Sequence, residues 1–478
     1  MDETLKIYPY IGNKDFYSRA LPFIYGATFL LTIMSLLGEG SFIFLPAMIV
    51  LVVLLKLFGT DAYPPVIFIA LLYQWIQVSI KPIYATLTFT SLEELAEFPD
   101  NIVTAYLLSC FGLLVMALGI YTAVRKIHIV PKQIINYIDE LDTRKTLVAY
   151  LSFSLFASLL YGLRFIVPGL FQGIVALGYI KWTLFFFAFY SALKKNEQRP
   201  LLNAIIVFEF ISGFASFFAD FKTIVFMVAI AYLALYRIKQ KQLVYLAIAA
   251  FAFGYVGTMW TAVKSDYRQF LNQDSATQQV KVSNSEALNY LADHIFDISA
   301  RSYEEALENT IDRISYIDYF SSCIAYVPAV VDHEGGQLSK AAVMHILVPR
   351  LFNPDKPAID DSVHLTKYTG VFYANASYGV SFALGYVPDF YIDFGPVFMF
   401  LALLIFGRMI GAIILSIHRT SINTFWGMAI MLPLFIIMYK FENSLIKFFG
   451  NLIMFWLVAM LFNKYLCSKV DGFLRDKR

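Results

Sequence analysis

The chain has 478 residues, of which 59% are hydrophobic and only 15% are charged. Soluble globular proteins average roughly 45–50% apolar and about 25% charged residues, so this composition excludes an ordinary soluble enzyme and indicates a protein embedded in lipid. The 37 basic and 35 acidic residues nearly cancel, to a formal net charge of +2, and no basic excess points to nucleic acid.

The N-terminal segment before the first apolar run carries several acidic and basic residues, so we expect no cleavable signal peptide there. A helix that crosses a bilayer needs about 20 mostly apolar residues. The sequence predicts about twelve such spans, near 20–37, 41–58, 64–80, 102–124, 146–166, 174–193, 202–219, 221–236, 242–263, 395–417, 424–440 and 447–464. Only Asp220 separates 202–219 from 221–236, so this pair is either two spans or a re-entrant hairpin.

The basic residues predict the orientation, because Lys and Arg are enriched in cytoplasmic connections. Alternate connections are basic, whereas the connection 81–101 has one Lys against several acidic residues. With an even number of spans, all basic connections and both termini fall on the cytoplasmic side. These connections contain Arg125, Lys126, Lys132, Arg144, Lys145, Lys194, Lys195, Arg199, Arg237, Lys239, Lys241 and Arg419.

The chain is therefore expected to have three parts. Residues 1–263 form spans one to nine, residues 264–394 form one large extracytoplasmic loop, and residues 395–478 form spans ten to twelve and a cytoplasmic tail. Apolar residues at three- and four-residue spacing predict helices at 285–298 and 302–317. From Pro328 onward the composition predicts ordered irregular structure. The fold expected is all-α.

Ionisable residues inside spans are costly and are functional candidates by default. Arg164 lies near the outer end of the fifth span, where a functional and a structural role remain equally open. Glu209 lies near the middle of the seventh span, where pairing with a cation on a neighbouring helix is the expected role. Lys181 and Arg408 are expected to extend toward the headgroups or to form structural pairs.

The stretch from His345 to Pro357 is the densest cationic segment of the loop. Three prolines favour a stiff, extended strap that holds Arg350 and Lys356. Such a strap suits planar Arg donors that bind a phosphate, although a solvated proline-rich loop is the simpler alternative.

Asp389 and Asp393 precede the tenth span and would share one face of a helix. They are candidates for a general base, although acidic residues also stabilise a helix N-terminus. The three cysteines form no CxxC pair, and the six histidines do not cluster, so no metal site or disulfide framework is expected.

Four features of the chain resemble Wzy-type oligosaccharide repeat-unit polymerases. They are the long late loop, Arg313 at the start of Arg313-Ile-Ser-Tyr-Ile-Asp-Tyr-Phe, the Val348-Pro349-Arg350…Lys356-Pro357 strap, and the Asp389-Phe-Tyr-Ile-Asp393-Phe-Gly entry to the next span. This family includes O-antigen polymerases and is distantly related to O-antigen ligases. The local match covers roughly residues 310–396, and elsewhere only the expected topology matches.

The resemblance implies a metal-independent glycosyltransferase of the bacterial cytoplasmic membrane that uses no cofactor. It would polymerise undecaprenyl-pyrophosphate-linked repeat units into O-antigen, capsule or exopolysaccharide on the extracytoplasmic side, with most of its site in the loop. Chain-length regulator and flippase proteins are the implied partners. The residues expected to hold the pyrophosphate are Arg164, Arg313, Arg350 and Lys356, and those expected to act as general base are Asp389, His345 and His364.

Two other functions remain open. A ligase would use the same donor and a different acceptor, so the cations do not distinguish it from a polymerase. A transporter of lipid-linked glycans would show inverted repeats and Gly/Pro-broken helices. The chain shows no such pairing, and a transporter has little use for the loop 264–394.

Overall fold

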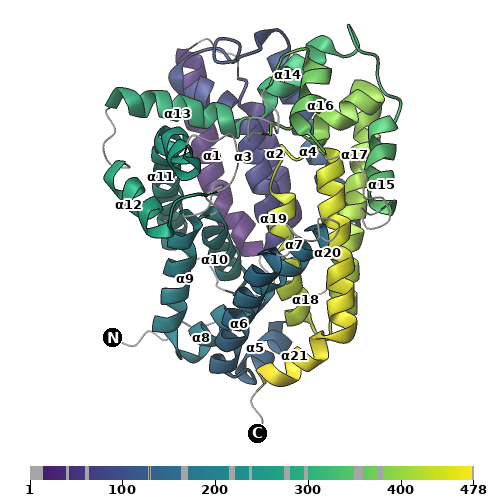
Figure 1. Ribbon diagram of the computed structural model, residues 1–478. Coiled ribbons are helices and arrows are strands. Elements are labelled where there is room, and N and C mark those ends of the chain that lie inside the picture. Colours follow the sequence, from purple (N-terminus) through teal and green to yellow (C-terminus); the bar gives the residue numbers. More distant parts are fainter. Residues whose placement is uncertain are drawn as a thin grey trace.

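The computed structural model describes residues 14–38, 42–59, 64–127, 129, 131–162, 171–214, 221–235, 240–273, 280–294, 300–348, 359–373 and 381–475. Within these ranges the regular elements are helices, and the extended pairing is limited to an isolated bridge between Leu141 and Arg475. The expected all-α fold is confirmed for this part of the chain (Figure 1).

The helices fall into two groups along the chain. Before residue 273 they are α1 (Lys14–Leu37), α2 (Leu45–Phe58), α3 (Pro65–Thr88), η1 (Pro99–Asn101), α4 (Ile102–Val124), α5 (Pro131–Asp139), α6 (Thr143–Gly162), α7 (Phe171–Gly178), α8 (Ile180–Lys195), α9 (Arg199–Phe214), α10 (Phe221–Leu235) and α11 (Gln240–Asn272). After it they are α12 (Asn284–His294), α13 (Ala300–Ile314), α14 (Ile317–Tyr326), α15 (Gln337–Leu347), α16 (Asp361–Thr369), α17 (Tyr386–Thr420), α18 (Thr424–Met431), α19 (Leu434–Met438), α20 (Leu445–Tyr465) and α21 (Cys467–Leu474).

Seven helical segments of the described chain are long and apolar enough to cross a membrane. They are Tyr17–Leu37, Pro65–Thr88, Pro99–Val124, Thr143–Gly162, Phe171–Lys195, Tyr386–Thr420 and Leu445–Tyr465. Shorter apolar helices occupy Leu45–Phe58, Phe221–Ala234 and Thr424–Met438. The protein is therefore a membrane-embedded, polytopic helical protein.

Each predicted span overlaps a helix of the structure, although several boundaries differ. The segments 202–219 and 221–236 correspond to two separate helices, α9 and α10, which pack against each other. The segment 174–193 is divided into α7 and α8, and the segment 424–440 into α18 and α19. Pro433 is the N-cap of α19, a position where the missing N–H of proline costs no helical hydrogen bond.

The tightest helix pair is α4 against α17. Gly407 and Gly411 of α17 lie on one face of the helix, and Gly119 of α4 lies opposite. A Cβ atom on Gly407 would overlap the Met116 carbonyl oxygen, so only glycine allows this approach. Glycines at four-residue spacing bring helices close together in membranes.

The two ends of the bundle differ in content (Figure 1). Helices α13, α14 and α16 gather at one end, and α5 and α21 lie at the other. Basic side chains of the connections bond at the second end, where Lys145 donates to the Arg475 carbonyl oxygen at 2.9 Å and Lys194 pairs with Asp139 at 2.5 Å.

The segment between α11 and α17 is more helical than expected. The predicted helices near 285–298 and 302–317 are confirmed as α12 and α13. The prediction of irregular structure from Pro328 onward is wrong for α15 and α16. Helix α15 includes His345, so the beginning of the expected strap is helical. The rest of the strap lies outside the described residues.

Helix α17 begins at Tyr386 rather than at residue 395 and is interrupted at Gly395. Gly395 has φ 70° and ψ 179°, a conformation that only glycine adopts readily. The short helix before the break carries Asp389 and Asp393, which share one face as expected. The break therefore separates a site-bearing turn from the apolar helix that follows.

Charges within the bundle form structural pairs. Glu209 lies 3.3 Å from the Lys181 Nζ and accepts a hydrogen bond of 2.5 Å from the Tyr150 hydroxyl. The expectation that Glu209 pairs with a cation on another helix is confirmed. Arg408 donates to the Thr122 hydroxyl at 3.0 Å.

Candidate functional site

The candidate site lies at the end of the bundle where α14, α16 and the start of α17 meet (Figure 1). Its centre is a histidine–carboxylate pair. His364 Nε2 lies 2.8 Å from Asp389 Oδ1, and the Leu445 N–H donates to Asp389 Oδ2 at 2.7 Å. Asp389 is only 2% exposed, so both oxygens have defined partners in a buried setting.

Local backbone features position the pair. Asp360 caps α16 by accepting hydrogen bonds from the Ser362 and Val363 N–H groups. Gly385, with φ 104°, precedes α17 and approaches the Phe441 carbonyl so closely that a Cβ atom would lie 2.9 Å from it. Asp389 therefore lies in the first turn of α17, beside the connection that leads into α20.

The electrostatics of His364 favour its charged form. Burial lowers the pKa of His364, but the Asp389 carboxylate offsets this through its charge and its hydrogen bond, so the net pKa is raised above its ordinary value. If Nε2 carries the proton shared with Asp389, Nδ1 is the basic nitrogen. The ring is 24% exposed, so solutes can reach it.

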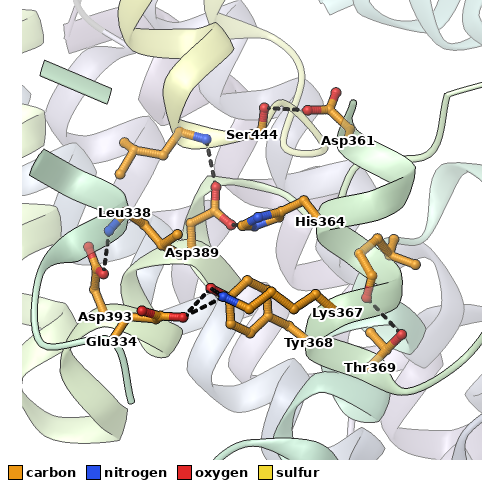
Figure 2. A network of polar contacts seen from close by, with 12 residues as sticks. Glu334, Leu338, Asp361, His364, Lys367, Tyr368, Thr369, Asp389, Asp393 and Ser444 are labelled. Carbon is orange, nitrogen blue, oxygen red and sulfur yellow. Dashed lines mark hydrogen bonds and ion pairs between the residues drawn. The ribbon is translucent and has the colours of Figure 1, made fainter. Parts of the chain in front are cut away.

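A second carboxylate adjoins this pair through the start of α20 (Figure 2). Asp361 accepts a hydrogen bond from the Ser444 hydroxyl at 2.9 Å and pairs with Lys447 Nζ at 2.5 Å. Ser444 directly precedes Leu445, whose N–H binds Asp389. One turn of chain thus connects the two carboxylates and holds α16 against α17 and α20.

Asp393 and Glu334 lie on the other side of the pair (Figure 2). Asp393 accepts from the Leu338 N–H at 2.9 Å and the Ser339 N–H at 2.7 Å, and so caps α15. Glu334 accepts from Lys367 Nζ at 2.7 Å and from the Tyr368 hydroxyl at 2.5 Å, as Figure 2 shows. Asp393 therefore has a structural role in orienting α15.

A buried lysine of α3, Lys81, joins α3 to α13 and α14. Lys81 is 2% exposed and lies 2.6 Å from Asp318 and 2.8 Å from Asp312. Asp318 also accepts the Glu97 N–H at 2.9 Å. These contacts anchor α13 and α14 on the bundle and position the neighbouring Arg313.

Cations gather where α10, α11 and α13 approach each other. Lys264 and Arg268 lie one turn apart on α11, which packs against α13, where Arg313 is in the last turn. Burial, and then the charges of Arg313, Arg268 and Lys222, lower the pKa of Lys264 to about 7. We call Lys222, Lys264, Arg268 and Arg313 the cation cluster.

Tyr316 lies within the field of Arg313 and of the carboxylates Glu442 and Asp361. Burial raises the pKa of its hydroxyl, and the charges of Glu442, Arg313 and Asp361 all act on it. Gln77 fixes Glu442 by donating to Oε2 at 2.5 Å. Arg313 of the cation cluster and Asp361, the carboxylate beside the His364–Asp389 pair, therefore act on the same tyrosine.

Only some of the site residues predicted from the sequence lie together in the structure. His364 and Asp389 are brought together, whereas His345 lies in the last turn of α15. Arg313 is exposed in the cation cluster. Arg164, Arg350 and Lys356 lie outside the described residues.

Several site residues were not anticipated. Asp361 binds Ser444, and Lys81 binds Asp318, in each case a partner more than 80 residues away in the sequence. No local sequence pattern predicts such pairs. Lys264 and Arg268 are among the cations that the sequence places in the loop 264–394, but only the packing of α11 against α13 brings them near Arg313. Within the described residues, no group of three metal-binding side chains forms.

Comparisons with known proteins place the chain in a family. No curated protein and no solved structure gives a match. A family model described as a domain of unknown function (DUF8712) matches residues 46–471. Because this match covers far more than half of the chain, the protein belongs to the DUF8712 family.

Proposed function

We propose that the protein is a membrane glycosyltransferase that polymerises undecaprenyl-pyrophosphate-linked repeat units at the outer face of the bacterial cytoplasmic membrane. The observation that carries this proposal is that the cation cluster and the His364–Asp389 pair lie at the same end of the bundle (Figure 1). One group suits a leaving pyrophosphate, and the other suits a hydroxyl that must lose a proton.

The topology in this proposal has twelve spans and both termini in the cytoplasm. Support comes from the overlap of each predicted span with a helix and from the basic residues at the end of the bundle that carries α5 and α21. Under the positive-inside rule that end is cytoplasmic, so the cation cluster and His364 face outward.

In the proposed reaction, a hydroxyl oxygen of the acceptor glycan attacks the sugar carbon that bears the donor pyrophosphate. The bond between that carbon and the pyrophosphate oxygen breaks, and the polyprenyl pyrophosphate leaves with the bonding electrons. Arg313, Lys264 and Arg268 stabilise the charge that develops on it. Arg164, Arg350 and Lys356 remain part of this proposal on sequence grounds.

The acceptor proton passes to His364 Nδ1 in this scheme. Asp389 holds the imidazole by Nε2 and stabilises the imidazolium that forms. The Leu445 N–H keeps Asp389 in place, so the ring orientation is defined before the acceptor binds. Asp389 is then a positioning residue, and His345 remains an alternative base.

A deletion strain tests the proposal. We expect it to accumulate single lipid-linked repeat units, and the His364→Ala variant to fail to restore polymer although it is present in the membrane. Arg408→Ala, which removes a cation far from the site, is the matched control and should restore normal polymer. Full-length polymer without transfer to its final acceptor would instead indicate a ligase.

A further inference from the structure

Helices α15, α17 and α20 enclose an apolar groove with a volume of about 290 Å³. Its wall includes Ala342 and Val343 of α15, Phe390, Ala402 and Ile405 of α17, and Phe449 of α20. Ser339 is the one residue of the wall with a polar side chain. Its N–H and hydroxyl both donate to Asp393, at 2.7 and 2.6 Å.

The groove therefore offers no free polar partner, whereas a buried water needs two to four of them. Hydrocarbon is the chemistry that fits. The groove is also continuous with the outer apolar surface of α17. Ile405 belongs to its wall and is 63% exposed, and Leu401 and Phe398 beside it are exposed as well. This helix is one of those able to cross the membrane.

One end of the groove touches the candidate site. Leu445 lines the groove with its side chain and donates its N–H to Asp389, and Phe390 follows Asp389 in the chain. The pairs His364–Asp389 and Lys447–Asp361 adjoin Leu445 through Asp389 and Ser444. A ligand with a long apolar chain matches the wall, and its polar head would reach the candidate site.

We propose that the groove binds the isoprenoid chain of a polyprenyl-linked substrate, with the head of the lipid at the candidate site. This inference rests on the proposed function, because it assigns the carrier lipid of that reaction to a place in the fold. The chain enters sideways from the bilayer, and the glycan it carries lies at the outer end of the bundle.

Photolabelling tests the inference in nanodiscs that contain the full chain. The probe is undecaprenyl phosphate with a photoreactive group on its isoprenoid chain, which carries no sugar. Ala402→Trp fills the groove, and Leu401→Trp, the adjacent lipid-facing position, is the control. We expect the probe to label Ala402→Trp at least about tenfold less than the wild type, because each methylene group of the probe that is displaced from the groove weakens binding roughly fourfold. The control should label like the wild type.

Equal labelling of Ala402→Trp and wild type would overturn the inference. Val343→Trp, at the exposed edge of the groove, gives the same test if Ala402→Trp does not fold. A photoreactive phospholipid that labels the groove and is not displaced by undecaprenyl phosphate would also overturn it, because the occupant would then be bulk lipid. Polymer made normally by the deletion strain refutes the proposed function instead, whatever the labelling result.

Discussion

His364 Nε2 lies 2.8 Å from Asp389 Oδ1, although the two residues belong to different helices, α16 and α17. The second Asp389 oxygen is held by the Leu445 N–H at the start of α20. Three elements thus converge on one carboxylate, and the imidazole they orient is the only member of the pair with notable exposure.

Replacing Asp389 should change the pH dependence of the reaction. The Asp389 charge raises the pKa of His364, so Asp389→Asn should lower that pKa. Because a base must be neutral, activity rises with pH through the His364 pKa, and the rising limb should move to lower pH in the variant. We expect the maximal rate to fall by about 10²-fold, since Asn does not stabilise an imidazolium. Polymer formation at a series of pH values measures this.

Asp393→Asn is the matched control for that variant. Asp393 is equally buried on the same helix face, but it caps α15 and does not contact His364. The control should keep the pH profile of the wild type while lowering thermal stability. Identical pH profiles for Asp389→Asn and the wild type would contradict the role given to His364.

Binding of an anion at the cation cluster should depend on pH around neutrality. Lys264, with a pKa lowered to about 7, is charged below this pH and mostly neutral above it. The affinity for pyrophosphate should therefore fall as pH rises through 7, and Lys264→Gln should flatten the curve. Calorimetric titration of the purified protein with pyrophosphate at pH 6 and pH 8 measures the difference. Because pyrophosphate also loses a proton over this range, the wild type is compared with Lys264→Gln, and the same pH dependence in both proteins would exclude Lys264 from the binding site.

Loss of Lys81 should destabilise the end of the bundle that carries the candidate site. Asp318 is 5% exposed, and without Lys81 it becomes a buried charge without its cation. Removing one partner of such a pair costs about 3–5 kcal/mol. Lys81→Met should lower the thermal midpoint in detergent, and the added Asp318→Asn should recover part of the loss. If the double variant is less stable than Lys81→Met, the pairing explanation is wrong.

The α4–α17 contact should not tolerate a methyl group. Gly407→Ala forces a Cβ atom into the Met116 carbonyl, and overpacking of this kind costs about 1–3 kcal/mol. Gly26→Ala has open space around its Cβ and should leave the thermal midpoint unchanged or slightly higher. Equal midpoints for both variants would show that the two helices can separate at little cost.

The apolar segments of the fold were predictable because lipid imposes a simple rule on length and composition. Each span expected from the sequence overlaps a helix, and α12 and α13 follow from their periodicity. Helices α15 and α16 were missed because they are short and the residues around them are typical of loops. Helix α15 is also capped by Asp393, which is distant in the sequence.

The site was less predictable than the fold. His364 and Asp389 were separate candidates, and only tertiary structure pairs them. The sequence left Asp393 as either a general base or a structural residue. Its hydrogen bonds to the first turn of α15 favour the structural role. Lys264 was one of several cations expected in the loop, and its lowered pKa was not predictable because its surroundings depend on α13 lying against α11.

The most direct test of the central claim is synthesis by the purified protein in proteoliposomes supplied with a lipid-linked repeat unit. The wild type should form products of two or more repeat units and release polyprenyl pyrophosphate. Arg313→Ala should be slower by about 10²–10³-fold, the usual cost of removing one group that stabilises developing negative charge, while Arg408→Ala stays active. Repeat units left unchanged by the wild type, or an Arg313→Ala protein as active as the wild type, would contradict the account.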